Sequence, residues 1–369
     1  MSRLLSGCFV SSLTLSICAN GFAANGDITV TGTTSTEELK VNSMVSAGAP
    51  EFPSPVCHDI TGMLGNCDQQ TPYRVARVAI NGGDYTNPVA AVDDLASWCG
   101  VPSSANPCLI QLYPGVYDIG TGSVHLDYDH LDLAGSGKNI TTIVGQTISA
   151  NSKAVVDITA SSYVHDISII NNRGLANSVA VAIDGFAKKA VLSRMNLTAD
   201  SLADINASAV QIGDDGSPVY PTIKDSYLYA HGSNSINTVF VKSNSRLTLE
   251  DSTLSVKCSA GCRTINLNQS NLVAHHINAQ STSDVLLMWE NTDGHTYTAT
   301  ITDSILSRGG ITTKVFIGTG NDHVVSIATT QIKKNGGSLG NVGTGTLKCV
   351  YAYDDDFNAL GSDCQPPPP

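Results

Sequence analysis

The sequence predicts an all-β fold, a right-handed single-stranded parallel β-helix with a short N-terminal capping helix. The pattern Asp-Ser-x-Leu, with Ile-Leu in its last form, recurs at Asp225, Asp251 and Asp303, at intervals of 26 and 52 residues. A second series of short apolar segments runs about half a period away, at intervals of 21 to 29 residues. Asn, Asp, Ser and Gly separate these segments, as turns require. So long a period indicates a coil whose every turn adds one short strand to each of two or three parallel sheets.

Residues 1–23 have the pattern of an export signal. Arg3 supplies the positive start, an apolar segment follows, and Gly21-Phe22-Ala23 gives a small-x-small cleavage motif. We therefore expect a secreted protein that is extracellular, periplasmic or held at a bacterial cell surface. No later run approaches the ~20 apolar residues of a membrane span, so no transmembrane segment is expected.

The rest of the chain divides into three parts by composition. Residues 24–72 are rich in Gly, Thr, Ser and Pro, which predicts a loosely structured N-terminal segment. Residues 73–348 contain the repeats and form the predicted β-helix. Within them, NPVAAVDDLASWC predicts the capping helix, with Asn87 as its N-cap and Pro88 in its first turn. Residues 349–369 predict a disulfide-bounded C-terminal cap followed by a proline-rich tail.

The repeated aspartates are interpreted as corners of the coil. Asp225, Asp251 and Asp303 each precede a strand, where an Asp side chain can hydrogen-bond its own backbone, so a structural role is favoured over a catalytic one. His275 and His276 are expected to be an exposed strand pair and not a metal site. Adjacent residues of a strand face opposite sides, which keeps two such rings apart.

Ten cysteines become eight when the predicted signal is removed. The eight fall in four close pairs, Cys57/Cys67, Cys99/Cys108, Cys258/Cys262 and Cys349/Cys364. An even count with local spacing in an exported chain favours four short-range disulfides, formed in an oxidising compartment. Zinc is the alternative for Cys258 and Cys262, but such a site needs a second pair at ligand spacing.

Composition narrows the class of partner. The chain carries 32 acidic and 20 basic residues, a net charge of -12, and only 14% of its residues are charged. A polyanion would be repelled unless a basic cleft or a bound cation offset this charge. No Lys/Arg stripe is present to neutralise phosphates, so nucleic acid is not an expected partner.

The N-terminal half of the repeat region resembles pectin lyase-like β-helix proteins, pectinesterases in particular. The matching text is Pro114-Gly115-Val116-Tyr117, then LDLAGSGKNITTIVG at 131–145 and VAVAI at 179–183. The spacing and order of these segments agree with that family, and the resemblance covers about residues 78–240. It implies a right-handed parallel β-helix.

The catalytic set of pectinesterases is not carried by this sequence. Val179 stands where the resemblance implies an oxyanion-stabilising Gln, and it has no donor. The family's two catalytic Asp have no counterpart, since Asn234, Ser235 and Asn237 occupy the second region, and its Gly-Arg-Pro-Trp is missing. Amides and hydroxyls cannot replace a carboxylate pair in proton transfer and nucleophilic attack.

A short motif also resembles the polygalacturonase signature. Asn-Thr-Asp-Gly at 291–294 matches its first element, and the implied inverting mechanism needs an acid together with carboxylates that activate water. The later Asp-Asp, Gly-His-Gly and Arg-Ile-Lys elements do not follow. Asp214 and Asp215 form an acid pair but precede the motif. We interpret the motif as a turn and retain Asp293, Asp214 and Asp215 as candidate catalytic residues.

No cofactor is firmly predicted, and calcium is the one that two patterns suggest. A pectate lyase-like site would need several carboxylates and an Arg base on one sheet face. The sequence offers Asp214 and Asp215 with Lys224, or Asp166 with Arg173 and Arg194, and solvated turns are the favoured interpretation of both clusters.

A second calcium pattern lies near the C-terminus. Asp354, Asp356 and Asn358 have the alternate spacing that begins a calcium loop. Ala359 stands where such a loop needs Gly, and Gln365 where it needs Glu, so the pattern departs from a complete calcium loop.

The sequence therefore favours a secreted non-catalytic β-helix that binds a polysaccharide or another cell-surface component, or acts as an adhesion element. Aromatic side chains expected to be exposed, and able to stack on sugars, are Tyr227, Tyr229, Trp289 and Tyr297, with a place in the core as the equal alternative for Trp289. The alternative is a carbohydrate-active enzyme with a rearranged site, similar to a pectate lyase, polygalacturonase or pectinesterase, acting on acidic polysaccharide. A phage-type tailspike, which would be a trimer, is a third hypothesis.

Overall fold

The structure is a computed structural model. It describes residues 56–58, 64–66, 73–146, 154–172, 178–185, 187, 189–201, 207–213, 216–288, 295–309, 314–318, 323–335, 338–341 and 345–365. The predicted signal at 1–23 and most of the segment 24–72 lie outside these residues. The chain divides into two compact units, residues 1–67 and 68–369. The first contains the antiparallel pair β1 (Val56–His58) and β2 (Leu64–Asn66).

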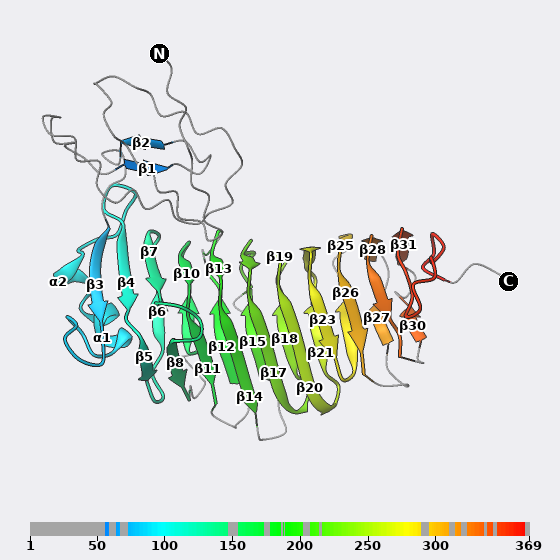
Figure 1. The fold of residues 1–369 in the computed structure, drawn as a ribbon, viewed down its shortest axis with the longest axis horizontal. Coiled ribbons are helices and arrows are strands. Elements are labelled where there is room, and N and C mark those ends of the chain that lie inside the picture. The colour runs from blue at the N-terminus through cyan, green and yellow to red at the C-terminus, as the bar shows by residue number, and fades with distance from the viewer. Residues whose placement is uncertain are drawn as a thin grey trace, which may run out of the picture. The chain divides into compact units, whose positions relative to one another are not determined.

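The second unit is a parallel β-solenoid, as predicted (Figure 1). Three sheets run along it, and all strand pairs among the described residues of these sheets are parallel. From β4 to β30, each coil contributes one strand to each sheet in turn. The 26-residue period of the sequence is therefore the length of one coil.

The strands of the three sheets are as follows. Sheet 1 contains β3 (Arg74–Val78), β4 (Cys108–Leu112), β7 (Leu131–Ala134), β10 (Tyr163–His165), β13 (Val191–Ser193), β16 (Thr222–Lys224), β19 (Arg246–Glu250), β22 (Asn271–His275), β25 (Tyr297–Thr302), β28 (His323–Ala328) and β31 (Thr346–Val350). Sheet 2 contains β5 (Gly115–Asp118), β8 (Thr141–Gly145), β11 (Ser168–Asn171), β14 (Asn196–Ser201), β17 (Tyr227–Asn234), β20 (Thr253–Ala260), β23 (Asn278–Ser281), β26 (Ile305–Arg308) and β29 (Gln331–Lys333). Sheet 3 contains β6 (Val124–Leu126), β9 (Val156–Ile158), β12 (Ser178–Ile183), β15 (Ala207–Ile212), β18 (Asn237–Val241), β21 (Arg263–Leu267), β24 (Asp284–Met288), β27 (Lys314–Gly318) and β30 (Ser338–Asn341).

The core consists of aliphatic side chains stacked in register from coil to coil. Strand side chains alternate between faces, so the same strand position points inward in every coil. One such row, every member of which is completely buried, contains Ile169, Leu197, Leu228, Leu254, Ala279, Leu306 and Ile332. These rows explain why short aliphatic segments recur in the sequence at the length of one coil.

The predicted capping helix is present but is broken into two short pieces, α1 (Pro88–Asp93) and α2 (Leu95–Trp98). Asn87 caps α1 by accepting a hydrogen bond from the Val89 N–H at 2.8 Å, and Pro88 occupies its first turn. Both pieces lie beside β3 at the first coil of the solenoid (Figure 1). Leu95 is buried there, so this element covers apolar surface of the first coils.

Three of the four predicted disulfides are present, Cys99–Cys108, Cys258–Cys262 and Cys349–Cys364. Zinc ligation by Cys258 and Cys262 is thus not supported. The fourth pairing lies outside the described residues, because Cys67 is not among them. No helix of the described part is long and apolar enough to cross a membrane.

Candidate functional site

The turn from sheet 1 to sheet 2 has the same backbone conformation in coil after coil. From β10 to β28, the residue directly after each sheet 1 strand has a left-handed backbone, with φ between 46° and 56°. This residue is Asp166, Arg194, Asp225, Asp251, His276, Asp303 or Thr329. We call these seven residues the corner ladder. Asp, Asn and His are enriched among non-glycine residues that adopt this conformation. The interpretation of Asp225, Asp251 and Asp303 as corner residues is confirmed.

The residue after the corner explains the serine of the repeated Asp-Ser pair. Its side chain points inward and is buried at Ser226, Ser252, Ser304 and Thr330. Each hydroxyl donates to the carbonyl two residues earlier, at 2.6 to 2.7 Å. Each also accepts an N–H from the preceding coil, at 3.0 to 3.3 Å. The hydroxyl thus satisfies buried backbone groups at the corner, which would be costly to leave unpaired.

In the N-terminal half of the ladder, the outward side chains form an ion-paired cluster. Arg194 binds Asp166 in a bidentate way, Nε to Oδ1 at 2.7 Å and Nη2 to Oδ2 at 2.6 Å. His165, the last residue of β10, places Nδ1 2.7 Å from Asp166 Oδ2. The Arg194 hydrogen bond, with a smaller effect of His165, holds the pKa of Asp166 below its ordinary value although burial opposes this. Asp166 and Arg194, two members of a suggested calcium cluster, thus pair with each other; the third, Arg173, lies outside the described residues.

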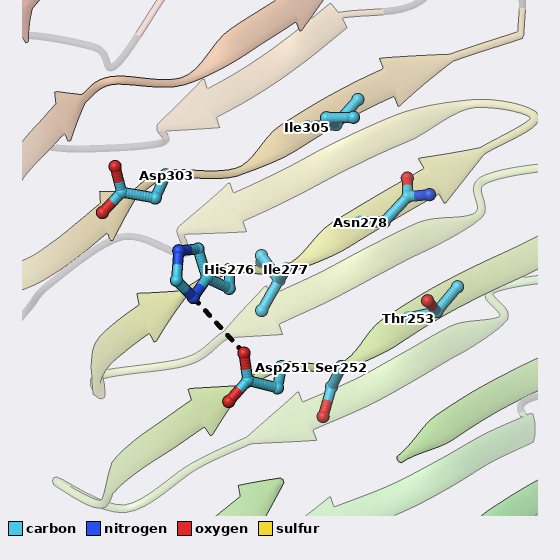
Figure 2. Close-up of a pocket in the computed structure, with 8 residues that line it drawn as sticks. All are labelled: Asp251, Ser252, Thr253, His276, Ile277, Asn278, Asp303 and Ile305. Carbon is cyan, nitrogen blue, oxygen red and sulfur yellow. Dashed lines mark ion pairs between the residues drawn. The ribbon is translucent and has the colours of Figure 1, made fainter. Parts of the chain in front are cut away.

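In the C-terminal half, the ladder brings two histidines and two aspartates together. His275 Nδ1 lies 3.2 Å from Asp303 Oδ2, and His276 Nδ1 lies 3.3 Å from Asp251 Oδ1. The two imidazole rings have centroids 3.9 Å apart. Figure 2 shows His276 between Asp251 and Asp303, the corner residues of the adjacent coils.

The expectation that His275 and His276 face away from each other is wrong. β22 ends at His275, and His276 is the corner residue with a φ of 51°. The alternation of strand side chains therefore stops before His276. The left-handed backbone turns its ring back beside that of His275.

A shallow groove begins at this cluster and continues onto sheet 2 (Figure 2). It has a volume of about 330 Å³. Its lining combines ladder residues with the first residues of three sheet 2 strands: Asp251, Ser252, Thr253, His276, Ile277, Asn278, Asp303 and Ile305. The ladder cluster and the outer face of sheet 2 therefore form one continuous surface.

The outer face of sheet 2 carries an aromatic group on β17, which we call the tyrosine face: Tyr227, Tyr229 and His231. Tyr227 is 40% exposed, and Tyr229 stacks on His231 with ring centroids 6.4 Å apart. Burial, with smaller effects of the neighbouring Tyr227 and Asp200, raises the pKa of Tyr229. His231 Nδ1 lies 3.1 Å from Asp200 Oδ1.

Polar side chains flank the tyrosine face on both neighbouring strands. Asn196 and Thr253 stand in register with Tyr227, while Thr198 and Ser255 stand in register with Tyr229. All four are partly exposed. The result is an aromatic surface with hydroxyl and amide groups on either side of it.

The remaining predicted binding and catalytic residues fall elsewhere. Tyr297 is only 3% exposed and its hydroxyl donates to Asn244 Oδ1, so its predicted exposure is wrong. Its place as the first residue of β25, an inward position, accounts for this burial. Trp289, Asp293, Asp214 and Asp215 lie outside the described residues.

The suggested calcium-loop residues form a tight turn. Asp354 Oδ1 accepts the backbone N–H of Asp356 at 3.0 Å and of Asn358 at 2.8 Å. The Asn358 side chain donates to Asp354 Oδ2 at 3.2 Å. Asp354 therefore acts as the hydrogen-bond acceptor of its own turn. Calcium binding by these residues stays a prediction.

The sequence analysis named His275 and His276 but missed that they meet Asp251 and Asp303. The repeat of the corner from coil to coil is the signal that could have found this cluster. Aligned on the corner, the segment HHIN at His275 occupies the same place as EDST at Glu250 and TDSI at Thr302. Because Asp251 and Asp303 are corner residues, His276 must be one too.

Comparison with known proteins finds distant similarity to solved structures and no match by sequence. No protein-family model matches the sequence, and no curated protein does. Among solved structures, the chain is similar to pectin methylesterase from carrot, with 14% identity and a TM-score of 0.47 over 79% of this chain and 85% of that one. It is similar to tailspike protein 2 of bacteriophage CBA120, with 10% identity and a TM-score of 0.44 over 76% of this chain and 45% of that one.

A third similar structure is the A-module of mannuronan C-5 epimerase AlgE4 from Azotobacter vinelandii. The identity is 12% and the TM-score 0.37, over 78% of this chain and 93% of that one. Similarity at this level carries no information about ligand or reaction.

Proposed function

We propose that the protein is an exported β-solenoid that binds a polysaccharide of a cell surface through the tyrosine face, without cleaving it. The observation that carries this proposal is the pair Tyr227 and Tyr229 on the outer side of one strand. Residues two apart in a strand point to the same face, so both rings are offered to one ligand. Aromatic rings with polar ends suit sugars, which have both apolar faces and hydroxyl groups.

The surroundings of the two tyrosines support a long ligand. A chain lying along the solenoid meets the same strand position in each coil, and Asn196, Tyr227, Thr253 and Asn278 form such a row. Amide and hydroxyl groups both donate and accept hydrogen bonds, as sugar hydroxyls require. The net charge of -12 favours a neutral polymer over an acidic one.

The Asp200 carboxylate supports the position of the aromatic group. Asp200 Oδ1 lies 3.1 Å from His231 Nδ1, and His231 in turn stacks on Tyr229. This contact holds the His231 ring beside Tyr229, which favours an ordered aromatic surface for a ligand.

Binding to a panel of immobilised neutral and acidic polysaccharides tests the proposal. The Tyr227→Ala/Tyr229→Ala double variant should weaken binding about tenfold, or by about 1.4 kcal/mol, because both aromatic surfaces that would stack on the sugar are lost. Tyr128→Ala, at a tyrosine 49% exposed in the turn between β6 and β7, is the matched control and should bind as the unaltered protein does. No binding to any polymer, or an equal loss in the control, would refute the proposal.

The same polymers distinguish binding from the enzymatic alternative. Each is incubated with the protein, with and without calcium, and assayed for reducing ends, unsaturated ends and released methanol. We expect none of these products. Their appearance would show a carbohydrate-active enzyme, and Asp293 is then the first residue to substitute.

A further inference from the structure

We propose that His275, His276 and Asp303 bind a divalent transition-metal ion such as zinc. Each residue offers a ligand atom, and these atoms all lie within 4.8 Å of one another. The proposal does not depend on polysaccharide binding, because His276 and Asp303 belong to the corner ladder, His275 directly precedes it at the end of β22, and none of the three belongs to the tyrosine face.

The backbone makes this convergence a fixed property of the coil. His275 ends β22, and its register partner Thr302 directly precedes Asp303 in the next coil. His276 and Asp303 occupy the same ladder position in adjacent coils, and neighbouring strands lie about 4.7–4.9 Å apart. Two adjacent residues of one coil and one residue of the next thus meet on one side of the corner.

The donor set fits a transition metal better than calcium. Two imidazoles and one carboxylate are ligands that zinc, copper and nickel accept, whereas calcium takes oxygen ligands only. All three side chains are partly exposed, at 45%, 55% and 39% for His275, His276 and Asp303. Exposure lets the ion enter and lets the side chains rotate onto it.

Neighbouring groups hold the rings in an orientation that suits ligation. Asp251 contacts Nδ1 of His276, and the Thr302 hydroxyl contacts Nδ1 of His275 at 2.8 Å. A metal-bound histidine generally donates its other ring N–H to a carboxylate or another acceptor. With Nδ1 held in this way, Nε2 of each ring remains for the metal. Asp303 would then exchange its contact with His275 for the ion, leaving a fourth position to water.

Isothermal titration of tag-free protein with zinc chloride, and separately with nickel and calcium chloride, tests the site. We expect one zinc per chain, binding of nickel at the same residues and no calcium binding there. His276→Asn and Asp303→Asn should each lower the zinc affinity at least tenfold. Asn tolerates the left-handed corner, so both variants should keep the fold, which circular dichroism checks.

His165→Ala is the matched control, because His165 ends β10 as His275 ends β22 and also contacts a corner aspartate. It should leave zinc binding unchanged. Replacing zinc by cobalt gives a second measurement, since visible absorption of bound cobalt should appear in the unaltered protein and be lost in His276→Asn. Absence of saturable zinc binding, or unchanged binding in both Asn variants, overturns the proposal.

Discussion

The two halves of the corner ladder share one backbone conformation but differ in the chemistry of their outward side chains. In the N-terminal half, the corner residues Asp166 and Arg194 neutralise each other, and His165 contacts the same carboxylate. In the C-terminal half, the equivalent positions are His276 and Asp303, with His275 beside them. The first cluster contains its own cation in the Arg194 guanidinium. The second has carboxylates and imidazoles, the donor set of the proposed zinc ion.

The corner requires a particular backbone conformation but not a particular outward side chain. The left-handed backbone recurs in both halves with aspartate, arginine or histidine, so the outward side chain does not determine the turn. Inward hydroxyls satisfy the buried backbone beside corners of both kinds. A solenoid can therefore change the chemistry of its corner from coil to coil while keeping the coil intact.

The largest predicted effect tests whether the inward hydroxyls stabilise both halves of the ladder equally. The Ser226 hydroxyl accepts the Met195 N–H, next to Arg194, while Ser304 accepts the Ile277 N–H, next to His276. Ser226→Ala and Ser304→Ala each leave a buried N–H unpaired, at a cost of about 2 kcal/mol. Thermal or urea unfolding should show losses of similar size in both variants. Ser255→Ala, on the outer face of sheet 2, should change stability by less than about 0.5 kcal/mol.

A loss in only one of the two buried-serine variants would show that the outward charges, and not the inner hydroxyls, hold that half of the ladder. The two halves would then not share one structural basis for the corner.

The next effect transfers the proposed metal site between the halves. Asp166→His together with Arg194→Asp places two histidines and an aspartate at the positions of His275, His276 and Asp303. Both new residues tolerate a left-handed corner. We expect a second zinc-binding event in titration calorimetry. Zinc should bind this new site at least tenfold more tightly than it binds the unaltered N-terminal cluster, a difference of about 1.4 kcal/mol in binding free energy.

Arg194→Asp alone is the control for the transfer, because it removes the guanidinium without adding a second histidine, and it should gain no such site. If the double variant folds yet binds no additional zinc, then the ladder geometry is not sufficient to assemble a metal site.

Much of this architecture could be predicted from the sequence because its signals are local. The repeat length gives the coil, Asp-Ser gives the corner with its inward hydroxyl, and Asn87-Pro88 gives the start of the capping helix. Each depends on the conformational preference of one or two residues. The three disulfides could be predicted because the two cysteines of each pair are close in the sequence.

The candidate site could not be predicted as well because it depends on register. Whether His276 continues a strand or turns a corner decides on which side its ring lies, and this is fixed by pairing with other coils. Tyr297 shows the same limit, since its hydroxyl partner Asn244 is 53 residues away. Alternation alone does not indicate which of two faces is the buried one.

The smallest predicted effect is the acid sensitivity of the N-terminal cluster. Arg194 and His165 hold the pKa of Asp166 below its ordinary value of 3.8. A carboxyl whose pKa is depressed in the folded state stabilises the protein above its unfolded pKa, and this contribution disappears as the pH falls through the folded value. Arg194→Gln should therefore lower the melting temperature at pH 7 and have a vanishing effect well below pH 3.8. Since the Arg194 side chain is 45% exposed, solvent screening limits the loss to below about 1 kcal/mol.

Two controls test whether this loss comes from the ion pair: a change in ionic strength and the substitution of a second arginine. Raising the ionic strength at pH 7 should shrink the difference between the unaltered protein and Arg194→Gln, because salt screens exposed charges. Arg246→Gln, at an exposed arginine that begins β19, should cost less and show no dependence on pH. A loss in Arg194→Gln that persists unchanged at low pH would mean that the arginine stabilises its corner by packing of its carbon chain, and the N-terminal half would then not be the charge-neutralised counterpart of the histidine cluster.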